Sequence, residues 1–181
     1  MLAGDHAGAL ECFTRLQTLP ESLGAGLWNE CRLVPHQYYQ ALCLEKLGKD
    51  GEAGEIYAHI LELKIDYFSN MHLPELPYYQ AEAHRRLGDH LAARALMDEY
   101  SRRCEEAIGK QDAGYFSTTP FFISYCDEPK RQRRAYYSAQ LGFAARFAGD
   151  SGREREWFEE AAAADCSNMW YQLESELANQ L

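Results

Sequence analysis

The chain has 181 residues, of which 46% are hydrophobic and 25% charged, and its formal net charge is −10. This composition is typical of a globular protein with enough residues for one domain or a short repeat array. The acidic balance argues against a nucleic-acid binder, and the sequence has no run of about 18–20 apolar residues that could cross a bilayer. The six cysteines are widely spaced, without a C-x-x-C pair, which favours free, mostly buried thiols in a cytoplasmic protein.

The first predicted element is a single helix over residues 5–18. It follows the turn sequence "AGD" and places Ala9, Phe13 and Leu16 at helical spacing. This pattern corresponds to the second helix of a hairpin whose first helix is absent. The chain is therefore expected to be a fragment of a longer protein.

Two helical hairpins are predicted next, over residues 35–64 and 75–109. Both contain the sequence "YYQA", and an alignment without gaps keeps seven of 23 positions identical. The identical positions include the pairs Leu47/Leu87, Gly48/Gly88 and Ala53/Ala93. Glycine adopts a left-handed conformation at low cost, so it ends the first helix, and the small alanine lets the second helix approach closely.

A third, more divergent hairpin is predicted over residues 130–165, and a capping helix over residues 167–180. The turn sequence "AGD" recurs before the second helix of this hairpin, whereas Glu154 stands where the repeat favours a small residue. An array of repeats needs its last apolar face covered. The residues expected to face inward from the cap are Met169, Trp170, Leu173 and Leu177.

These hairpins resemble the tetratricopeptide repeat (TPR), which has small and large residues at fixed helix positions. The residues that carry the resemblance are Ala41, Leu44, Ala53, Tyr57 and Ile60 in the first full hairpin, Ala81, His84, Ala93, Met97 and Tyr100 in the second, and Leu141, Gly142, Ala145, Phe158 and Ala161 in the third. The resemblance implies an all-α fold: a right-handed TPR-like superhelix of about three full hairpins, a half hairpin and a capping helix. It implies one repeat domain over residues 1–181.

The segments between the hairpins are longer than a TPR of about 34 residues allows and are rich in aromatic residues. Two interpretations remain open: these segments fill gaps against the helices, or Tyr115, Phe116, Phe121 and Phe122 wall a ligand pocket. The spacing, together with "LPESLG" and "YFS…P…DEPKRQRRAYYSAQLG", is similar to the helical tail of large bacterial multidomain proteins. In those proteins a β-sandwich portion related to carbohydrate-active proteins precedes TPR-like repeats.

The sequence contains no motif of a catalytic, metal or cofactor site. It has no H-E-x-x-H, no histidine pair at i, i+4, no G-x-S-x-G, no P-loop and no Rossmann glycine pattern. Acidic clusters such as "REREWFEE" contain interleaved arginines, which is typical of a solvated helix face. We therefore expect no enzymatic activity, no cofactor and no metal.

The candidate binding site is the concave surface that the first helices of a TPR array present. Its candidate residues are Tyr38, Lys46, Tyr78, Arg85, Arg86, Phe143 and Arg146. Arginine donates hydrogen bonds in a fork that suits carboxylates, so this groove predicts an acidic peptide or a carboxylate-bearing sugar as ligand. The alternative is that the arginines are ordinary surface residues paired with Glu45 and Glu82.

The leading hypothesis is a non-enzymatic scaffold that binds a protein or peptide in a concave helical groove. Open repeat ends also offer a surface for self-association, and no nucleic-acid or membrane partner is expected. The runner-up is the helical accessory region of a multidomain carbohydrate-active bacterial protein. A third hypothesis, a hydrolase built from the carboxylate clusters, would require activity from the isolated chain.

Overall fold

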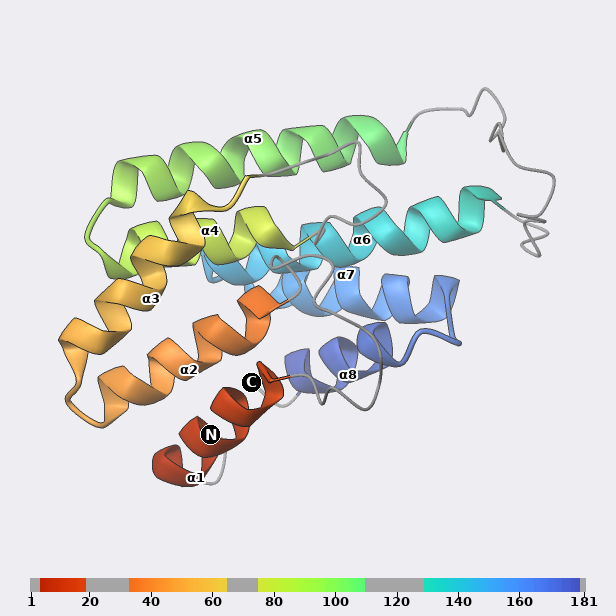
Figure 1. Ribbon diagram of the computed structural model, residues 1–181. Helices are drawn as coiled ribbons and strands as arrows, with labels where there is room; N and C mark the ends of the chain where they lie inside the picture. Colours follow the sequence, from red (N-terminus) through yellow and green to blue (C-terminus); the bar gives the residue numbers. More distant parts are fainter. Residues whose placement is uncertain (1–3, 19–32, 65–74, 110–128, 180–181) are drawn as a thin grey trace, which may run out of the picture. The chain divides into compact units, whose positions relative to one another are not determined.

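The computed structural model describes residues 4–18, 33–64, 75–109 and 129–179, and within these ranges it contains helices and no strand (Figure 1). The predicted all-α class is confirmed. The helices are α1 (His6–Leu16), α2 (Val34–Lys46), α3 (Asp50–Glu62), α4 (Leu76–Arg86), α5 (His90–Ile108), α6 (Pro129–Ala148), α7 (Ser151–Ala164) and α8 (Met169–Ala178). α2 and α6 each begin one residue before the predicted hairpin, and the other helix bounds fall within the predicted segments. None of these helices is long and apolar enough to cross a membrane.

The chain divides into two compact units, residues 1–97 and 98–181, and the boundary falls inside α5. In unit 1, α1 packs on α2, α2 on α3 and α3 on α4 (Figure 1). The first helices of the two hairpins, α2 and α4, also contact each other. The tyrosines of the repeated "YYQA" contribute to this core, where the Tyr38 ring centroid lies 5.4 Å from that of Tyr79 and 6.1 Å from that of Tyr57.

The turns inside the hairpins share one backbone geometry, as the glycine spacing predicts. Gly48, Gly88 and Gly149 have φ angles of 73°, 87° and 73°. In the first turn, the Gly48 N–H donates to the Glu45 carbonyl at 3.0 Å and the Lys49 N–H donates to the Leu44 carbonyl at 2.9 Å. The same pair of bonds recurs in the other two turns. This is the Schellman motif, in which a left-handed glycine lets two carbonyls at the helix end find donors.

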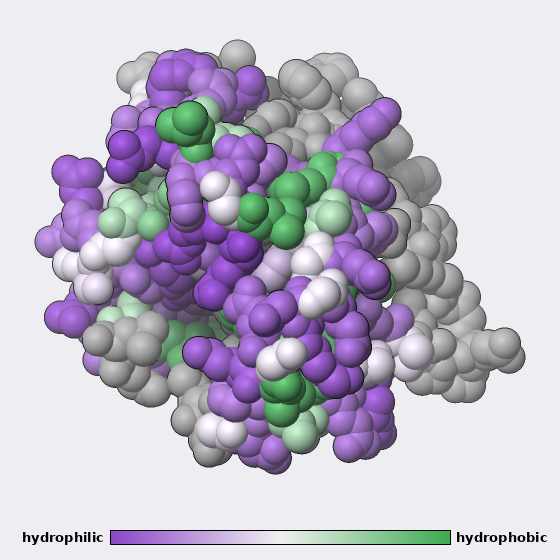
Figure 2. All heavy atoms as spheres, turned by 90° about the vertical axis from the view of Figure 1, so that its left-hand side faces the viewer, coloured by the Kyte–Doolittle hydropathy of each residue, from purple (hydrophilic) through white to green (hydrophobic). Residues whose placement is uncertain are grey.

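The side of unit 1 that carries the turns α2–α3 and α4–α5 is largely hydrophilic, with small separate hydrophobic patches (Figure 2). Leu47, Leu87 and Leu91 of these turns are exposed. Isolated exposed leucines are normal on protein surfaces, so these residues do not define an interface by themselves.

Unit 2 contains the end of α5 and helices α6 to α8, with α6 packed along α7 and α7 on α8. Its centre is a T-shaped pair of buried rings, Phe143 and Phe158, whose centroids are 5.2 Å apart. Gly142 permits this contact, because a Cβ atom there would lie 2.9 Å from the Phe158 ring. The repeat position that sequence comparison marks as small is therefore a point of close helix approach.

The predicted inward face of the capping helix is wrong. Met169 is 85% exposed and Leu173 is 43% exposed, whereas Tyr171, Glu174 and Ala178 are the buried residues of α8. The buried face is rotated by one residue, or about 100° of helix, from the predicted one. Glu174 faces inward because it pairs with Arg146 of α6.

The described cysteines are free, but only half of them are buried. Cys43 and Cys104 lie in the interior, whereas Cys12 and Cys166 are exposed. The prediction of free thiols holds for these four residues, and the prediction that most are buried does not.

Candidate functional site

The seven candidate residues fall in both units. Tyr38, Lys46, Tyr78, Arg85 and Arg86 belong to unit 1. The remaining two, which lie on α6, belong to unit 2 and are described with it. These residues occupy equivalent positions of the repeat, but their surroundings differ.

The two tyrosines are part of the core and do not line an open groove. Tyr38 and Tyr78 are both buried, and Tyr78 packs edge-on against Tyr79 at 5.2 Å. The Tyr38 hydroxyl donates to Glu82 Oε2 at 3.0 Å. Burial and the neighbouring Glu82 carboxylate raise the pKa of Tyr38, so the hydroxyl stays protonated as a donor. The two tyrosines were expected to line a groove, but their rings instead pack in the core between the helices.

The arginines are paired with carboxylates, as the alternative interpretation predicts. Arg85 Nη2 lies 2.6 Å from Glu82 Oε2, and Arg86 Nη1 lies 3.0 Å from Glu45 Oε2. Lys46 is exposed on the last turn of α2. The expected basic strip is therefore largely neutralised in unit 1.

Among the described acidic residues of unit 1, Glu82 is the most buried, with 2% of its surface exposed. A buried carboxylate is costly unless it is hydrogen-bonded and paired. Both conditions are met by the Tyr38 hydroxyl from α2 and the Arg85 guanidinium from α4. This arrangement fixes the contact between the first helices of two consecutive hairpins.

The candidate residues of unit 2 are also internal. Phe143 is buried, and Arg146 bonds to Glu154 of α7 and Glu174 of α8, each at 2.7 Å. The guanidinium carbon also lies over the Phe143 and Phe158 rings, at 5.3 and 5.0 Å from their centroids. Glu154, which departs from the repeat pattern, is explained by this charge cluster.

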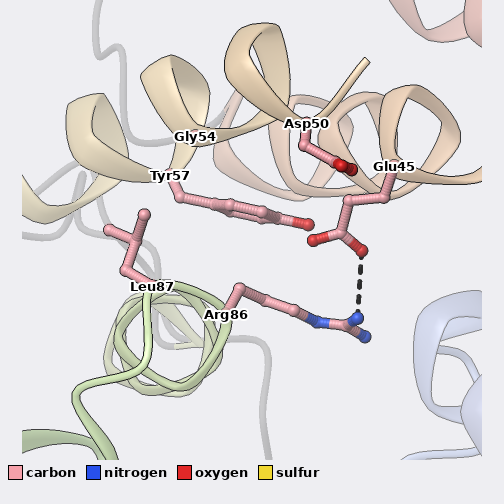
Figure 3. Close-up of a pocket in the computed structure, with 6 residues that line it drawn as sticks. All are labelled: Glu45, Asp50, Gly54, Tyr57, Arg86 and Leu87. Carbon is pink, nitrogen blue, oxygen red and sulfur yellow. Dashed lines mark hydrogen bonds and ion pairs between the residues drawn. The ribbon is translucent and has the colours of Figure 1, made fainter. Parts of the chain in front are cut away.

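A half-open pocket of about 320 Å³ lies in unit 1, where the end of α2, the first half of α3 and the end of α4 meet (Figure 3). The residues that line it are Glu45, Asp50, Gly54, Tyr57, Arg86 and Leu87. The Glu45 carboxylate lies beside the Tyr57 hydroxyl, and the Arg86 guanidinium lies on the opposite side of the pocket, bonded to Glu45 (Figure 3). The pocket therefore combines two carboxylates, one guanidinium, one phenol and one apolar side chain.

Tyr57 is the unusual member of this pocket. It is 2% exposed, and its hydroxyl lies beside the Glu45 carboxylate (Figure 3). Burial and then the nearby Glu45 carboxylate raise the pKa of Tyr57, so the hydroxyl is a neutral donor and acceptor at physiological pH. The Glu45 carboxylate therefore lies between two donors, the Tyr57 hydroxyl and the Arg86 guanidinium.

Sequence reasoning missed the pocket residues on α3. It assigned binding to first helices only, whereas Asp50, Gly54 and Tyr57 belong to the second helix of the first hairpin. The signal that could have found them is the turn itself, because a Schellman turn brings the residues before and after Gly48 together. The aromatic residues 115, 116, 121 and 122 lie outside the described residues.

A second surface pocket, of about 380 Å³, lies in unit 2 between the end of α5, α6 and α7. The residues that line it are Ser101, Glu105, Leu141, Ala144, Ala145, Ala148, Asp150, Arg153, Glu156 and Trp157. Three of its lining residues are alanines of α6, and its charged residues are exposed. Within residues 4–18, 33–64, 75–109 and 129–179, no cluster of His, Cys, Asp and Glu is arranged to hold a metal ion.

No family model matches this chain, and neither a curated protein nor a solved structure is significantly similar to it.

Proposed function

We propose that this chain is a non-enzymatic scaffold that binds a protein or peptide segment on its helical hairpins. The proposal includes a TPR-like stacking of consecutive hairpins around a concave groove. It is supported by the direct contact between α2 and α4 and by the identical turns of the hairpins. Helical repeats of this kind present extended surfaces and bind chains through them.

The observation that carries the proposal is the pocket at the ends of α2, α3 and α4. Its walls are held in place before any ligand arrives, because the Schellman turn at Gly48 joins α2 to α3, and the bonds Tyr38–Glu82 and Glu45–Arg86 join α2 to α4. A preformed site lowers the ordering cost of binding. Its volume is at the lower end of the roughly 300–1,000 Å³ of small-molecule sites, which suits one anchoring side chain.

A phage-displayed library of random 12-residue peptides, selected against the full chain, tests this function. We expect enrichment of a consensus peptide that binds saturably in calorimetry and shifts backbone amide signals of Gly54 and Leu87 in NMR spectra. The charge of the consensus also tests the predicted preference for acidic peptides. No enrichment above that of an unrelated helical protein of equal charge would refute the scaffold proposal.

A further inference from the structure

Helix α8 has the features of a first helix of the repeat. Its sequence "WYQL" corresponds to the "YYQA" of α4, and in both helices the glutamine binds the end of the preceding second helix. Gln80 Nε2 donates to the Ile60 carbonyl of α3 at 3.0 Å. In the same way, Gln172 Nε2 donates to the Ala162 carbonyl of α7 at 3.0 Å. Helix α8 therefore packs on α7 as α4 packs on α3, but the described residues contain no second helix that completes its hairpin.

Without a second helix on it, α8 exposes an apolar face. Trp170 is 38% exposed, whereas Tyr78, at the equivalent position of α4, is 7% exposed. Leu173 is also exposed, whereas its equivalent, Ala81, is fully buried. Met169 lies with Trp170 and Leu173 within about 100° of the helix surface, which is the width of stripe that a helix normally buries. The end of a repeat array is normally polar, so this α8 face (Met169, Trp170 and Leu173) is suited to contact with another helix.

Helix α1 has the complementary features, those of a second helix. It follows Gly4, whose φ of 79° matches that of the turn glycines, and the Asp5 side chain caps it by accepting from the Gly8 N–H, as the equivalent aspartate does for α7. Leu16 is 54% exposed, whereas Ile60, its equivalent in α3, is fully buried. Within the described residues α1 packs on α2, and no first helix precedes it in its own hairpin. Its open apolar positions, the α1 face, are Ala9, Phe13 and Leu16.

We propose that the α8 face of one copy of this chain docks on the α1 face of a second copy, so that the two helices form an intermolecular hairpin. The α2–α3 hairpin is the template, and in it the Tyr38 and Tyr57 ring centroids lie 6.1 Å apart. Trp170 and Phe13 occupy the equivalent positions, so their rings meet across the intermolecular contact. The two helices also match in length, with 11 residues in α1 and 10 in α8.

A second copy is the occupant because each face supplies what the other lacks. Leu173 is a large residue where the other first helices have alanine, and the α1 residue opposite it in the template is the small Ala9, so the two interdigitate. The contact joins two different surfaces, so each end copy keeps one free face and association continues head to tail. Two short helices form a contact below the standard size of about 1,200–2,000 Å², so association is expected at micromolar or higher concentrations.

Sedimentation velocity on the full chain tests this pairing through complementation. The wild-type mass should rise with concentration beyond twice the chain mass of 20.7 kDa. Leu16→Glu and Leu173→Glu each remove one face at an exposed position, so both variants should keep their circular dichroism spectra and stay monomeric. Their equal mixture should associate again and stop at two copies, because each variant keeps one intact face. Leu91→Glu, at an 85% exposed leucine of α5 outside both faces, is the matched control and should associate as wild type does.

Three results would overturn the proposal. The first is a wild-type chain that stays monomeric at about 1 mM, a concentration that populates even weak complexes. The second is association that survives Leu16→Glu but not Leu173→Glu, since α8 would then pair with another α8. The third is a mixture of the two variants that stays monomeric. The pairing does not depend on peptide binding, so it and the scaffold proposal can fail separately.

Cross-linking of the wild-type chain tests the same pairing without a substitution. Cys12 lies on α1 and Cys166 lies just before α8, and both thiols are exposed. In an equal mixture of unlabelled and nitrogen-15-labelled chain, a bis-maleimide should join Cys12 of one copy to Cys166 of another, as mixed-isotope peptides in mass spectrometry. Dimers that contain only Cys12–Cys12 or only Cys166–Cys166 links would overturn the head-to-tail pairing.

Discussion

Replacement of Arg146 by methionine tests whether the buried charge cluster holds the third hairpin and the capping helix together. Arg146 bonds to Glu154 and Glu174 at 2.7 Å each, and the exposed fractions of the three side chains are 18%, 9% and 3%. The guanidinium also lies over the Phe143 and Phe158 rings. Arg146→Met keeps a side chain of similar reach but removes the charge from all four contacts.

The expected loss of stability is large because two carboxylates would remain buried without a cation. Breaking a buried ion pair by removing one partner costs about 3–5 kcal/mol, and a desolvated cation–π contact adds about 0.5–2 kcal/mol. The total free energy of unfolding of a small protein is about 5–15 kcal/mol. Arg146→Met should therefore remove a large share of the stability of unit 2.

The pH dependence of the loss follows from the carboxylates. Burial raises the pKa of Glu174 above its ordinary value of 4.5 even with Arg146 present. A carboxyl with a raised folded pKa contributes stability below its unfolded pKa and loses it as the pH rises through the folded pKa. Removal of Arg146 raises the folded pKa of Glu174 further, so the variant should be weakest at neutral pH and recover as the pH falls toward 4.5.

Urea unfolding followed by circular dichroism at pH 7 and pH 5 measures both effects. Arg102→Met is the matched control, because Arg102 also bonds to two glutamates, Glu99 and Glu106, but on an exposed face of α5. This control should leave the midpoint unchanged, since exposed ion pairs contribute little. Equal losses from both variants, or a loss from Arg146→Met that does not shrink in acid, would refute the reasoning.

Three further predictions concern packing and thiol chemistry. Gly142→Ala should destabilise by about 1–3 kcal/mol in urea unfolding because its Cβ would meet a phenylalanine ring at 2.9 Å. Gly54→Ala, in open space within α3, should instead stabilise by about 0.5–1 kcal/mol, and the same sign for both would contradict the packing. Ala53→Leu should cost about 1–3 kcal/mol through overpacking, and a tolerated leucine would show that this helix contact is loose. Burial raises the pKa of Cys104 to about 12, so iodoacetamide should alkylate exposed Cys166 first in mass spectrometry, and equal rates would contradict the burial.

The sequence predicted helix positions well because the signals for them are local. A glycine with a positive φ and the residue after it set the Schellman turn at Gly48, and the same signal recurs at Gly88 and Gly149. The small residues before and after these turns, such as Ala53, mark where the second helix packs. These features depend on residues within about one helical turn, so a single sequence contains them in full.

The burial of charged residues could not be predicted in the same way. Hydrophobic periodicity assigns glutamate and arginine to the surface, and this assignment is correct for most of them. Glu174 faces inward only because Arg146 lies opposite it, and Glu82 is buried only because Tyr38 and Arg85 reach it from two helices. These partners lie far apart in the chain or have no repeat signature, so neither periodicity nor spacing identifies them.

The same pairings explain why unit 1 has a pocket with paired charges in place of the expected basic groove. A carboxylate that is bonded within the fold has little hydrogen-bonding capacity left, as Glu82 shows with Arg85 of the same helix and Tyr38 of α2. Glu45 is bonded to Arg86 and lies beside the Tyr57 hydroxyl, whereas Asp50 is exposed at the start of α3. Most charged groups near this pocket are thus used for contacts within the fold. Because two carboxylates line the pocket and its one guanidinium is bonded to Glu45, the charge of the lining does not favour the acidic ligand that counting arginines suggested.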